Sequence, residues 1–426
     1  MKSILSSIQW VVFILAGSIV APVAVGDAFQ LPIEEIAGLL QRSFLIIGIG
    51  SLLQVFWGHE LPIAEGPAGL WWGVFMVFAG FGTAMQMDTY EILQSLEMGL
   101  LISGCVFITM GGFGLINKIK IIFTPMVTGT YLFLLVSQLS GPFVKGILGV
   151  GYMTPHIDGK VFFSAFIILI FTALLSKSRY PMVRSFSILY GIIAGWLLFA
   201  VLGITKPITI EVRSIIDFPK LMIWGSPRFD GGIMLTSVIT ALLLLSNLIA
   251  SIEVVKKQVD TQQMVNYNRA GLMMGINQIL AGLFCTIGFV PVSTSAGFIA
   301  TTRLKEKGPF IFGSTLILLI SFFPVITLFF ASLPPPVGYA TIFLAFSNLI
   351  IMAFKEFTTV IGDSSRMQIL AVSLMVGIGS MFVPSSALKY VPGFLVSIVN
   401  NGLILGVIIC IILEQVLIKL ERRKES

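Results

Sequence analysis

The sequence predicts an all-α polytopic membrane protein whose helices are interrupted twice by short extended strands. The 426 residues are 56% hydrophobic and only 11% charged, with a mean hydropathy of +1.00, which is too apolar for a soluble core. Most apolar runs are about 17 to 25 residues long, the length of a helix that crosses a hydrocarbon core of about 30 Å. Two proline-led segments, residues 62–69 (PIAEGPAG) and 291–297 (PVSTSAG), mark the expected strands.

Hydropathy predicts fourteen spans, with boundaries uncertain by about four residues. The first seven lie near residues 7–25, 38–57, 61–81, 93–115, 121–140, 161–176 and 183–203. The second seven lie near residues 232–255, 268–288, 289–302, 309–331, 336–354, 367–384 and 393–418. The run from Ile8 to Val25 has no small-residue cleavage site, so we expect it to remain as the first helix. Residues 1–230 and 231–426 are the two expected seven-span repeats.

The distribution of basic residues predicts the orientation. An even number of spans puts both termini on one side of the membrane. Eighteen of the 26 Lys and Arg residues then fall on the side of the termini and eight on the other. Because Lys and Arg near short loops remain cytoplasmic, both termini should be cytoplasmic. The same bias explains the net charge of +6 without a nucleic-acid partner.

Internal repetition supports two halves of opposite orientation. When residues 125–139 are placed over residues 335–349, Pro, Val, Phe, Leu, Ser and Leu coincide, and Gln138 faces Asn348. These are the fifth spans of the two halves, and the proline-led segments lie in the third spans of the same halves. Repeats of seven spans insert with opposite orientation because seven is odd. Such repeats bring their third spans together near the membrane midplane, where transporters bind their solutes.

Four stretches together resemble the nucleobase-ascorbate transporter family, also called the second nucleobase-cation symporter family. The first helix has Gln9 followed by small residues and Pro22, and the fifth span opens with Pro-Met-Val-Thr-Gly at residues 125–129. The eighth span has an acid at Glu253. The family signature of the tenth span corresponds to residues 294–303 (TSAGFIATTR), in which Thr294 and Ser295 replace the usual amide or acid and Asn.

The resemblance implies a fold and a function. Spans 1–4 and 8–11 would form a core domain that carries the site, and spans 5–7 and 12–14 a gate domain. The strands of the third and tenth spans would cross beside the solute. The implied activity is proton symport of a purine or pyrimidine base, like a uracil or xanthine permease, through the cell membrane. A homodimer is also implied. The sequence selects neither the base nor H+ over Na+, although Na+ is the less favoured.

Glu253 is the first candidate for binding the base. An ionisable group inside a membrane span costs roughly 2.5 to 3.5 kcal/mol and is a functional candidate by default. By its family position, it would accept hydrogen bonds from ring N–H groups and exchange the coupled proton. The alternative is an ion pair at the inner membrane surface with Lys256 or Lys257, three and four residues further along the helix.

Glu65 is the second candidate. Superposing Pro62 on Pro291 places Glu65 on Thr294, which suggests that the acid has moved from the tenth span to the third. Glu65 would then bind the base and take part in proton coupling. Superposing the Ala-Gly pairs instead places Glu65 on Ser293. The alternative role is a cap on the half-helix that begins near Ala68, where a carboxylate is favourable.

The remaining predicted site residues are small or carry hydroxyl groups. Ser293, Thr294 and Ser295 would bond carbonyl groups of the base, while Ala68, Gly69 and Gly297 would allow its close approach to the backbone. Trp71 and Trp72 are expected at interfaces or in packing gaps, and Asn247 as a bond between helices. The cysteines, Cys105, Cys285 and Cys410, are far apart, and no metal site or cofactor is expected.

Two other classes of function remain as alternatives. Anion carriers or exchangers share the inverted-repeat architecture, but positive groups should surround their site, and two carboxylates count against that substrate. A channel would conduct without proton coupling. An enzyme is not expected, because the chain has no phosphate-binding, metalloprotease or serine-nucleophile motif.

Overall fold

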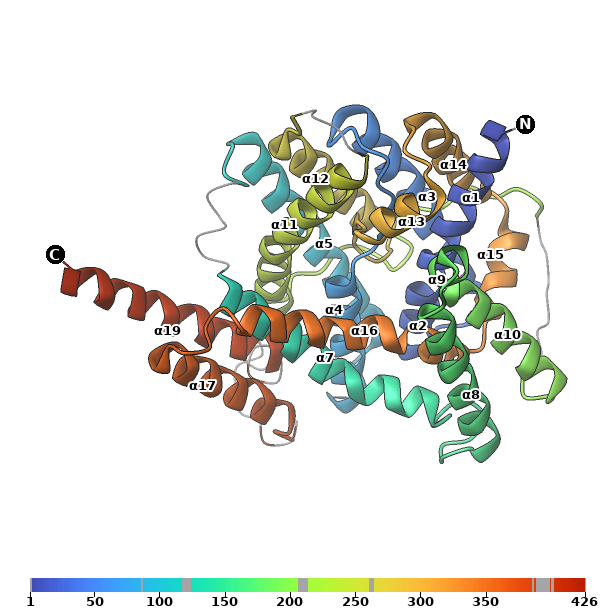
Figure 1. The fold of residues 1–426 in the computed structure, drawn as a ribbon. Helices are drawn as coiled ribbons and strands as arrows, with labels where there is room; N and C mark the ends of the chain where they lie inside the picture. Colours follow the sequence, from blue (N-terminus) through green and yellow to red (C-terminus); the bar gives the residue numbers. More distant parts are fainter. Residues whose placement is uncertain are drawn as a thin grey trace.

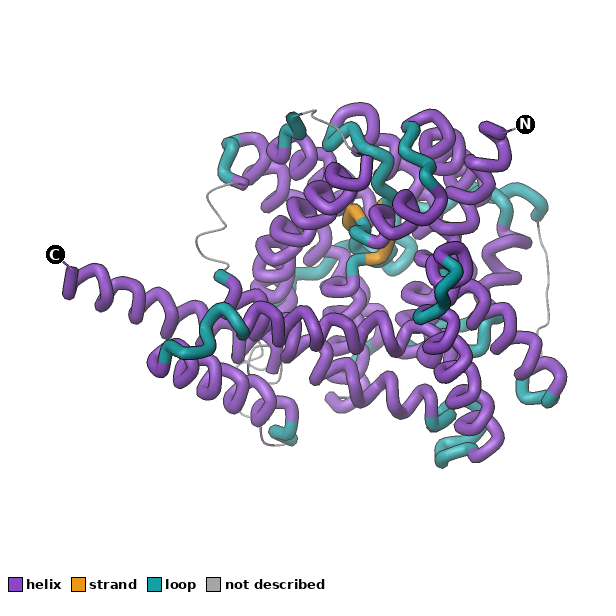
Figure 2. Tube along the Cα trace, viewed as in Figure 1, coloured by secondary structure: helices purple, strands orange, loops and turns teal. Residues whose placement is uncertain are grey.

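A computed structural model describes residues 2–85, 87–116, 124–205, 214–259, 264–384 and 402–425, with residues 387 and 399. The fold is a bundle of helices around one small sheet (Figures 1 and 2). The first half contains α1 (Lys2–Ser18), α2 (Val20–Ala28), α3 (Ile33–Trp57), β1 (Glu65–Pro67), α4 (Gly69–Met85), α5 (Thr89–Gly112), α7 (Pro125–Ile147), α8 (Gly159–Ser176), α9 (Pro181–Ser185) and α10 (Ser187–Val201). The second half contains α11 (Gly231–Val259), α12 (Tyr267–Leu283), β2 (Phe289–Pro291), α13 (Thr294–Thr302), α14 (Lys307–Ile320), α15 (Pro324–Ala331), α16 (Pro335–Phe357), α17 (Ser364–Met381) and α19 (Gly402–Glu425).

Eight helical segments in the described residues are long and apolar enough to cross a membrane, or nine if a bent pair counts as one. The fold is therefore that of a multi-pass membrane protein. The count of fourteen spans stays a prediction, because several predicted spans correspond to shorter helices: α4 has 17 residues, α10 has 15 and α13 has nine. Residues 393–398, at the start of the last predicted span, lie outside the described residues, as do five basic residues used for orientation, Lys118, Lys120, Lys206, Arg213 and Lys389.

Prolines coincide with two breaks in the helices. In the first predicted span, α1 ends at Ser18 and α2 begins at Val20, because Pro22 has no N–H to donate to the carbonyl of Ser18. The one span predicted near residues 309–331 corresponds to two helices, α14 and α15, which meet at an angle of 87°. Pro324 begins α15 and disfavours helical angles at the preceding residue, Phe323.

Glycines allow helices from the two halves to pack closely. A Cβ atom at Gly104 of α5 would lie 2.8 Å from the carbonyl oxygen of Gly275 in α12, and the reciprocal distance is also 2.8 Å. Gly111 of α5 lies against Asn268 of α12, so the two helices run antiparallel. Small residues allow such approach between membrane helices, where packing replaces the hydrophobic effect as the driving force.

The fifth predicted spans, α7 and α16, also pack against each other in opposite directions (Figure 1). Gly129, near the start of α7, contacts Phe357 at the end of α16, and Gly146 near the end of α7 contacts Tyr339 near the start of α16. Contacts between other helices occur in matched pairs: α3 packs on α14 as α5 packs on α12, and α1 packs on α14 as α11 packs on α5. Two inverted repeats would produce this pattern, and their boundary at residue 230 stays a prediction.

A strand is present in each of the third and tenth predicted spans, but the bounds of the second differ from the prediction: β2 ends at Pro291 instead of beginning there, and residues 294–297 belong to α13. β1 and β2 form a two-stranded antiparallel sheet in which Gly66 faces Val290, and Figure 2 shows it enclosed by helices. Just outside it, the backbone N–H of Ala68 donates to Gly288 O and that of Val292 to Ala64 O, each at 2.9 Å. The sheet therefore joins the two halves of the chain by backbone hydrogen bonds.

A compact turn positions β1 after α3. The carbonyl of Gln54 accepts hydrogen bonds from the N–H groups of Gly58 and Glu60, and Nδ1 of His59 accepts one from Leu61 N–H at 3.0 Å. Burial, reinforced by the positive charge of Lys307, lowers the pKa of His59 to about 3. The imidazole in this turn is therefore neutral at physiological pH, the form in which Nδ1 can accept.

We predict that Gly275→Ala destabilises the protein, because the added methyl group has no room at the α5–α12 contact. Overpacking of this kind costs about 2 kcal/mol. The matched control is Gly80→Ala in α4, where no neighbouring atom lies within 4 Å of the new Cβ. Thermal unfolding of both variants in detergent measures the difference. Equal midpoints would contradict the close packing of α5 on α12.

Candidate functional site

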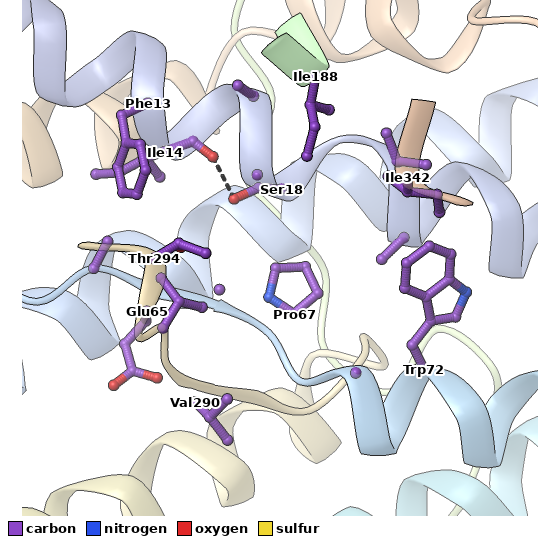
Figure 3. Close-up of a pocket in the computed structure, with 18 of the residues that line it drawn as sticks. Phe13, Ile14, Ser18, Glu65, Pro67, Trp72, Ile188, Val290, Thr294 and Ile342 are labelled. Atoms are coloured by element: carbon purple, nitrogen blue, oxygen red, sulfur yellow. Dashed lines mark hydrogen bonds between the residues drawn. The ribbon is translucent and has the colours of Figure 1, made fainter. Parts of the chain in front are cut away.

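A cavity of about 330 Å3 lies in front of the two strands, a size within the range of small-molecule sites. Its walls come from the α1–α2 junction, the segments around β1 and β2, and helices α10, α11 and α16 (Figure 3). The lining residues are Phe13, Ile14, Ala16, Gly17, Ser18, Val20, Ala21, Ala64, Glu65, Gly66, Pro67, Gly69, Trp72, Ile188, Leu189, Asn247, Val290, Val292, Ser293, Thr294, Ile342 and Phe346. Both halves of the chain therefore contribute to one cavity.

The local sequence explains why this backbone is extended. Pro67 and Pro291 lack an N–H group and cannot continue a helix, and each ends its strand. The half-helices α4 and α13 start within three residues of these prolines, at Gly69 and Thr294. Non-helical backbone at membrane depth is tolerated only where it lines a cavity or is enclosed by protein. Here it does both.

The polar side chains that face the cavity are neutral. They are Ser18, Asn247, Ser293 and Thr294. Ser18 Oγ donates to Ile14 O at 2.6 Å, so its lone pairs can accept from a ligand. Asn247 Oδ1 accepts from Ser251 Oγ at 3.2 Å, so the amide nitrogen of Asn247 can donate. No lysine or arginine is among the described residues that line the cavity.

Aromatic rings form much of the apolar wall. The indole of Trp72 meets Phe346 edge-on, with ring centroids 4.9 Å apart, and Phe346 lies 4.8 Å from Phe143. On the opposite wall, Phe13 stacks on Phe298 at 4.6 Å. Packed rings hold these surfaces in place, and planar ligands stack on such surfaces.

Glu65 belongs to the cavity through its backbone. Its side chain points away from the cavity, on the far side of β1 (Figure 3), and is only 1% exposed. There Asn277 Nδ2 donates to Oε2 at 3.4 Å, while Oε1 has no hydrogen-bond partner among the described residues. The carboxyl group thus lies behind the strand, opposite the position where it would contact a ligand in place of Thr294.

Glu253 lies away from the cavity. It is not among the lining residues, and its carboxylate accepts a hydrogen bond from the hydroxyl of Tyr267 at the start of α12. From the same helix, Asn247 reaches the cavity six residues earlier, which is about 9 Å along the axis. In this structure α11 therefore presents an amide to the cavity instead of the predicted acid.

The remaining predicted site residues divide into two groups. Gly69, Ser293 and Thr294 line the cavity. The other three are not among the lining residues: Ala68 is buried, and Ser295 Oγ accepts from Ala64 N–H at 3.2 Å and so anchors the strand, while Gly297 is exposed on α13. Two of the three predicted hydroxyl-bearing residues, Ser293 and Thr294, thus line the cavity.

Sequence reasoning missed three features. Asn247 and Trp72 line the cavity although their expected roles were packing. Only their positions in the sequence could have indicated a place at the cavity: Asn247 is an amide in an apolar run, and Trp72 follows a predicted strand. Glu97, buried in α5 and accepting from Cys285 Sγ at 3.4 Å, is a third acid inside a span.

Curated relatives match almost the whole chain. The "Putative purine permease YwdJ" of Bacillus subtilis is 40% identical over 100% of this chain and 98% of its own length. The "Xanthine permease" of the same organism is 22% identical over 97% and 93%. The "Uric acid permease PucJ", also from Bacillus subtilis, is 23% identical over 96% and 91%.

Two solved structures share the fold. The transmembrane domain of the cyanobacterial bicarbonate transporter BicA gives a TM-score of 0.61 at 13% identity, covering 97% of this chain and 96% of that chain. The murine anion transporter Slc26a9 in its inward-facing state gives 0.65 at 11% identity, covering 98% and 68%. At these identities the likeness concerns the fold alone.

Family membership follows from a match over most of the length. Residues 1–386 match the model of the "Permease family", named for xanthine and uracil permeases, in agreement with the motifs of the first, fifth and tenth spans. The fold and the relatives agree with a membrane transporter, not an enzyme. The chain belongs to the nucleobase-ascorbate transporter family.

Proposed function

We propose that this protein imports a nucleobase together with a proton. The observation that carries the proposal is the cavity itself, which combines neutral hydrogen-bonding groups and extended backbone with aromatic rings on two opposite walls. A purine or pyrimidine base is a flat ring with alternating donors and acceptors at its edge. Such a ring would stack on the apolar wall and bond Asn247, Ser293 and Thr294 through its edge.

The names of the relatives support the same class of substrate. They are called purine, xanthine and uric acid permeases, and the purine permease is 40% identical over the full chain. Anion carriers share the fold, but an anion would need positive charge at its site. No basic side chain from the described residues lines this cavity, so the neutral base is the better fit.

The proposed membrane arrangement has fourteen spans in two inverted repeats, residues 1–230 and 231–426, with both termini cytoplasmic in the cell membrane. A core of spans 1–4 and 8–11 would move against a gate of spans 5–7 and 12–14. The cavity is consistent with this division, because α10 and α16 of the gate face β1 and β2 of the core across it. Alternating access would then expose the base to each side in turn, and two copies would form a homodimer.

Glu65 is the proposed proton carrier. It is a buried acid on a strand that forms the cavity wall, so its protonation can affect the wall without contact between the carboxyl group and the base. In a symporter, proton binding and substrate binding stabilise each other by the same free energy. Glu253, with its Tyr267 partner away from the cavity, is the weaker candidate for this role.

Competition uptake tests the substrate and the coupling together. Cells that lack their own permeases and express this chain should accumulate labelled bases from a panel of uracil, xanthine, hypoxanthine, guanine and urate. Accumulation should disappear when a protonophore collapses the pH gradient. Uptake of bicarbonate or sulfate without any base would contradict the proposal, and uptake insensitive to the protonophore would indicate a channel.

A second prediction separates Asn247 from Glu253. Asn247→Leu should weaken binding of the transported base roughly tenfold, the value of about one hydrogen bond to a buried ligand. Glu253→Gln should leave the affinity within about twofold, because it does not line the cavity. Equilibrium binding to purified protein measures both, with thermal unfolding as the folding control. The reverse ranking would restore Glu253 as the ligand.

A further inference from the structure

We propose that Asn277 couples the protonation of Glu65 to binding of the base. The neutral carboxyl group of Glu65 and the Asn277 amide form a pair with two hydrogen bonds, and this pair holds β1 in the form that binds the base. This inference rests on the proposed proton symport and adds a positioning residue to it. Asn277 lies on α12, in the second half of the chain, behind the sheet that lines the cavity.

The two side chains are buried together with unused hydrogen-bonding capacity. Glu65 is 1% exposed and Asn277 is 0% exposed. One hydrogen bond joins them, from Asn277 Nδ2 to Glu65 Oε2 at 3.4 Å. Glu65 Oε1 and Asn277 Oδ1 have no partner among the described residues. Buried polar atoms without a partner are uncommon and costly, so this pair of acceptors needs an explanation.

A single proton satisfies both oxygens. When Glu65 takes up a proton on Oε1, the new O–H can donate to Asn277 Oδ1 while the amide N–H continues to donate to Oε2. The carboxylic acid and the amide are then joined by two antiparallel hydrogen bonds. On release, the O–H bond breaks, the proton returns to water, and Glu65 Oε1 and Asn277 Oδ1 are again without a partner among the described residues. Only a proton is exchanged.

The position of Asn277 is fixed by its neighbours. A Cβ atom at Gly50 of α3 would overlap the Asn277 amide, so the absence of a side chain at residue 50 makes room for it. The next residue of α3 also bonds β1: Ser51 Oγ accepts from the backbone N–H of Glu65 at 3.0 Å. The next residue along α12, Gln278, donates to Phe289 O of β2 at 2.7 Å. Helices α3 and α12 therefore hold both strands from behind.

The strand connects the pair to the cavity. Glu65 through Pro67 form β1, and the backbone of this strand lines the cavity on the face opposite the carboxyl group. A change in how the Glu65 side chain is held therefore acts on atoms that touch the proposed ligand. By linkage, a base that binds this form of the strand favours the protonated pair in return.

The other elements that pack on β1 offer no competing charge. In α1, residues 3–18 contain no ionisable side chain, and β2 contains none. In α3, Glu34 and Glu35 lie in the first turn, at least sixteen residues before Ser51, which is about 24 Å along the helix. Arg42 of the same helix donates to Cys285 O nine residues before Ser51, about 13 Å away along the helix. The neutral His59 accepts a hydrogen bond within the turn that follows α3. On α12, the hydroxyl of Tyr267 donates to Glu253, and Arg269 lies eight residues before Asn277.

Infrared spectroscopy can observe the pair without any ligand. Difference spectra of the purified protein between pH 5.5 and 8.5 should contain the C=O stretch of a protonated carboxyl group that disappears in Glu65→Gln. The frequency of this band should shift in Asn277→Leu, because the bond to the amide is gone. The matched control is Gln278→Leu, which removes the bond to β2 and should leave the frequency unchanged. An unshifted band in Asn277→Leu overturns the pair.

Binding of labelled hypoxanthine and labelled uracil over the same pH range tests its coupling role. Wild-type affinity should fall by up to about tenfold per pH unit on the alkaline side, as one linked proton requires. The affinity of Glu65→Gln should change by no more than about twofold over this pH range. Its side-chain amide forms two hydrogen bonds with Asn277 at every pH, as the neutral acid does. Asn277→Leu should move the midpoint of the pH dependence of binding by about one pH unit, whereas Gln278→Leu should leave that midpoint unchanged.

The outcomes separate this inference from the function on which it rests. If none of the five bases of the uptake panel binds while the infrared band behaves as expected, the proposed substrate fails and the pair stands. If a base binds with wild-type pH dependence in Asn277→Leu, the pair fails and nucleobase symport stands. Binding that requires Na+ and ignores pH would also overturn the role of Asn277 as a reader of protonation.

Discussion

The structure depends on one constraint: inside a membrane, every backbone N–H and C=O group needs a partner. A helix satisfies its own groups, but a helix interrupted by proline does not. In this chain, the two interrupted segments satisfy each other. β1 and β2 pair in antiparallel register, and the flanking bonds of Ala68 and Val292 extend the pairing. The cavity exists because this pairing keeps extended backbone stable among helices.

The sequence predicted this centre because its signals are local. Pro62, Pro67 and Pro291 exclude continuous helices where they stand, and their equivalent positions in two halves indicated that the segments meet. Long apolar runs likewise predicted the helices, and α3, α7 and α16 begin within about five residues of the predicted boundaries. Bends were harder to predict: hydropathy does not distinguish a straight span from the 87° turn between α14 and α15.

Side-chain direction limited the prediction of the site. The backbone of Glu65 lines the cavity, but alternation along a strand decides which face a side chain uses, and the start of a three-residue strand could not be fixed from sequence. Position along a helix was equally hard to predict for Glu253 and Asn247. The two residues are six positions apart on α11, well over one turn, so only Asn247 lies at the depth of the cavity. A resemblance in residue type favoured the acid, whereas the packing of α11 selects the amide.

The pairing of β1 with β2 also has a consequence for biosynthesis. Gly66 bonds to a strand whose facing residue, Val290, is synthesised more than two hundred residues later. During translation, the first half enters the membrane with a proline-broken segment whose strand partner does not yet exist. That segment needs water, the translocon or a neighbouring helix to satisfy its backbone until β2 is synthesised. The binding site is thus completed late, and a chain truncated before residue 289 has no means of forming it.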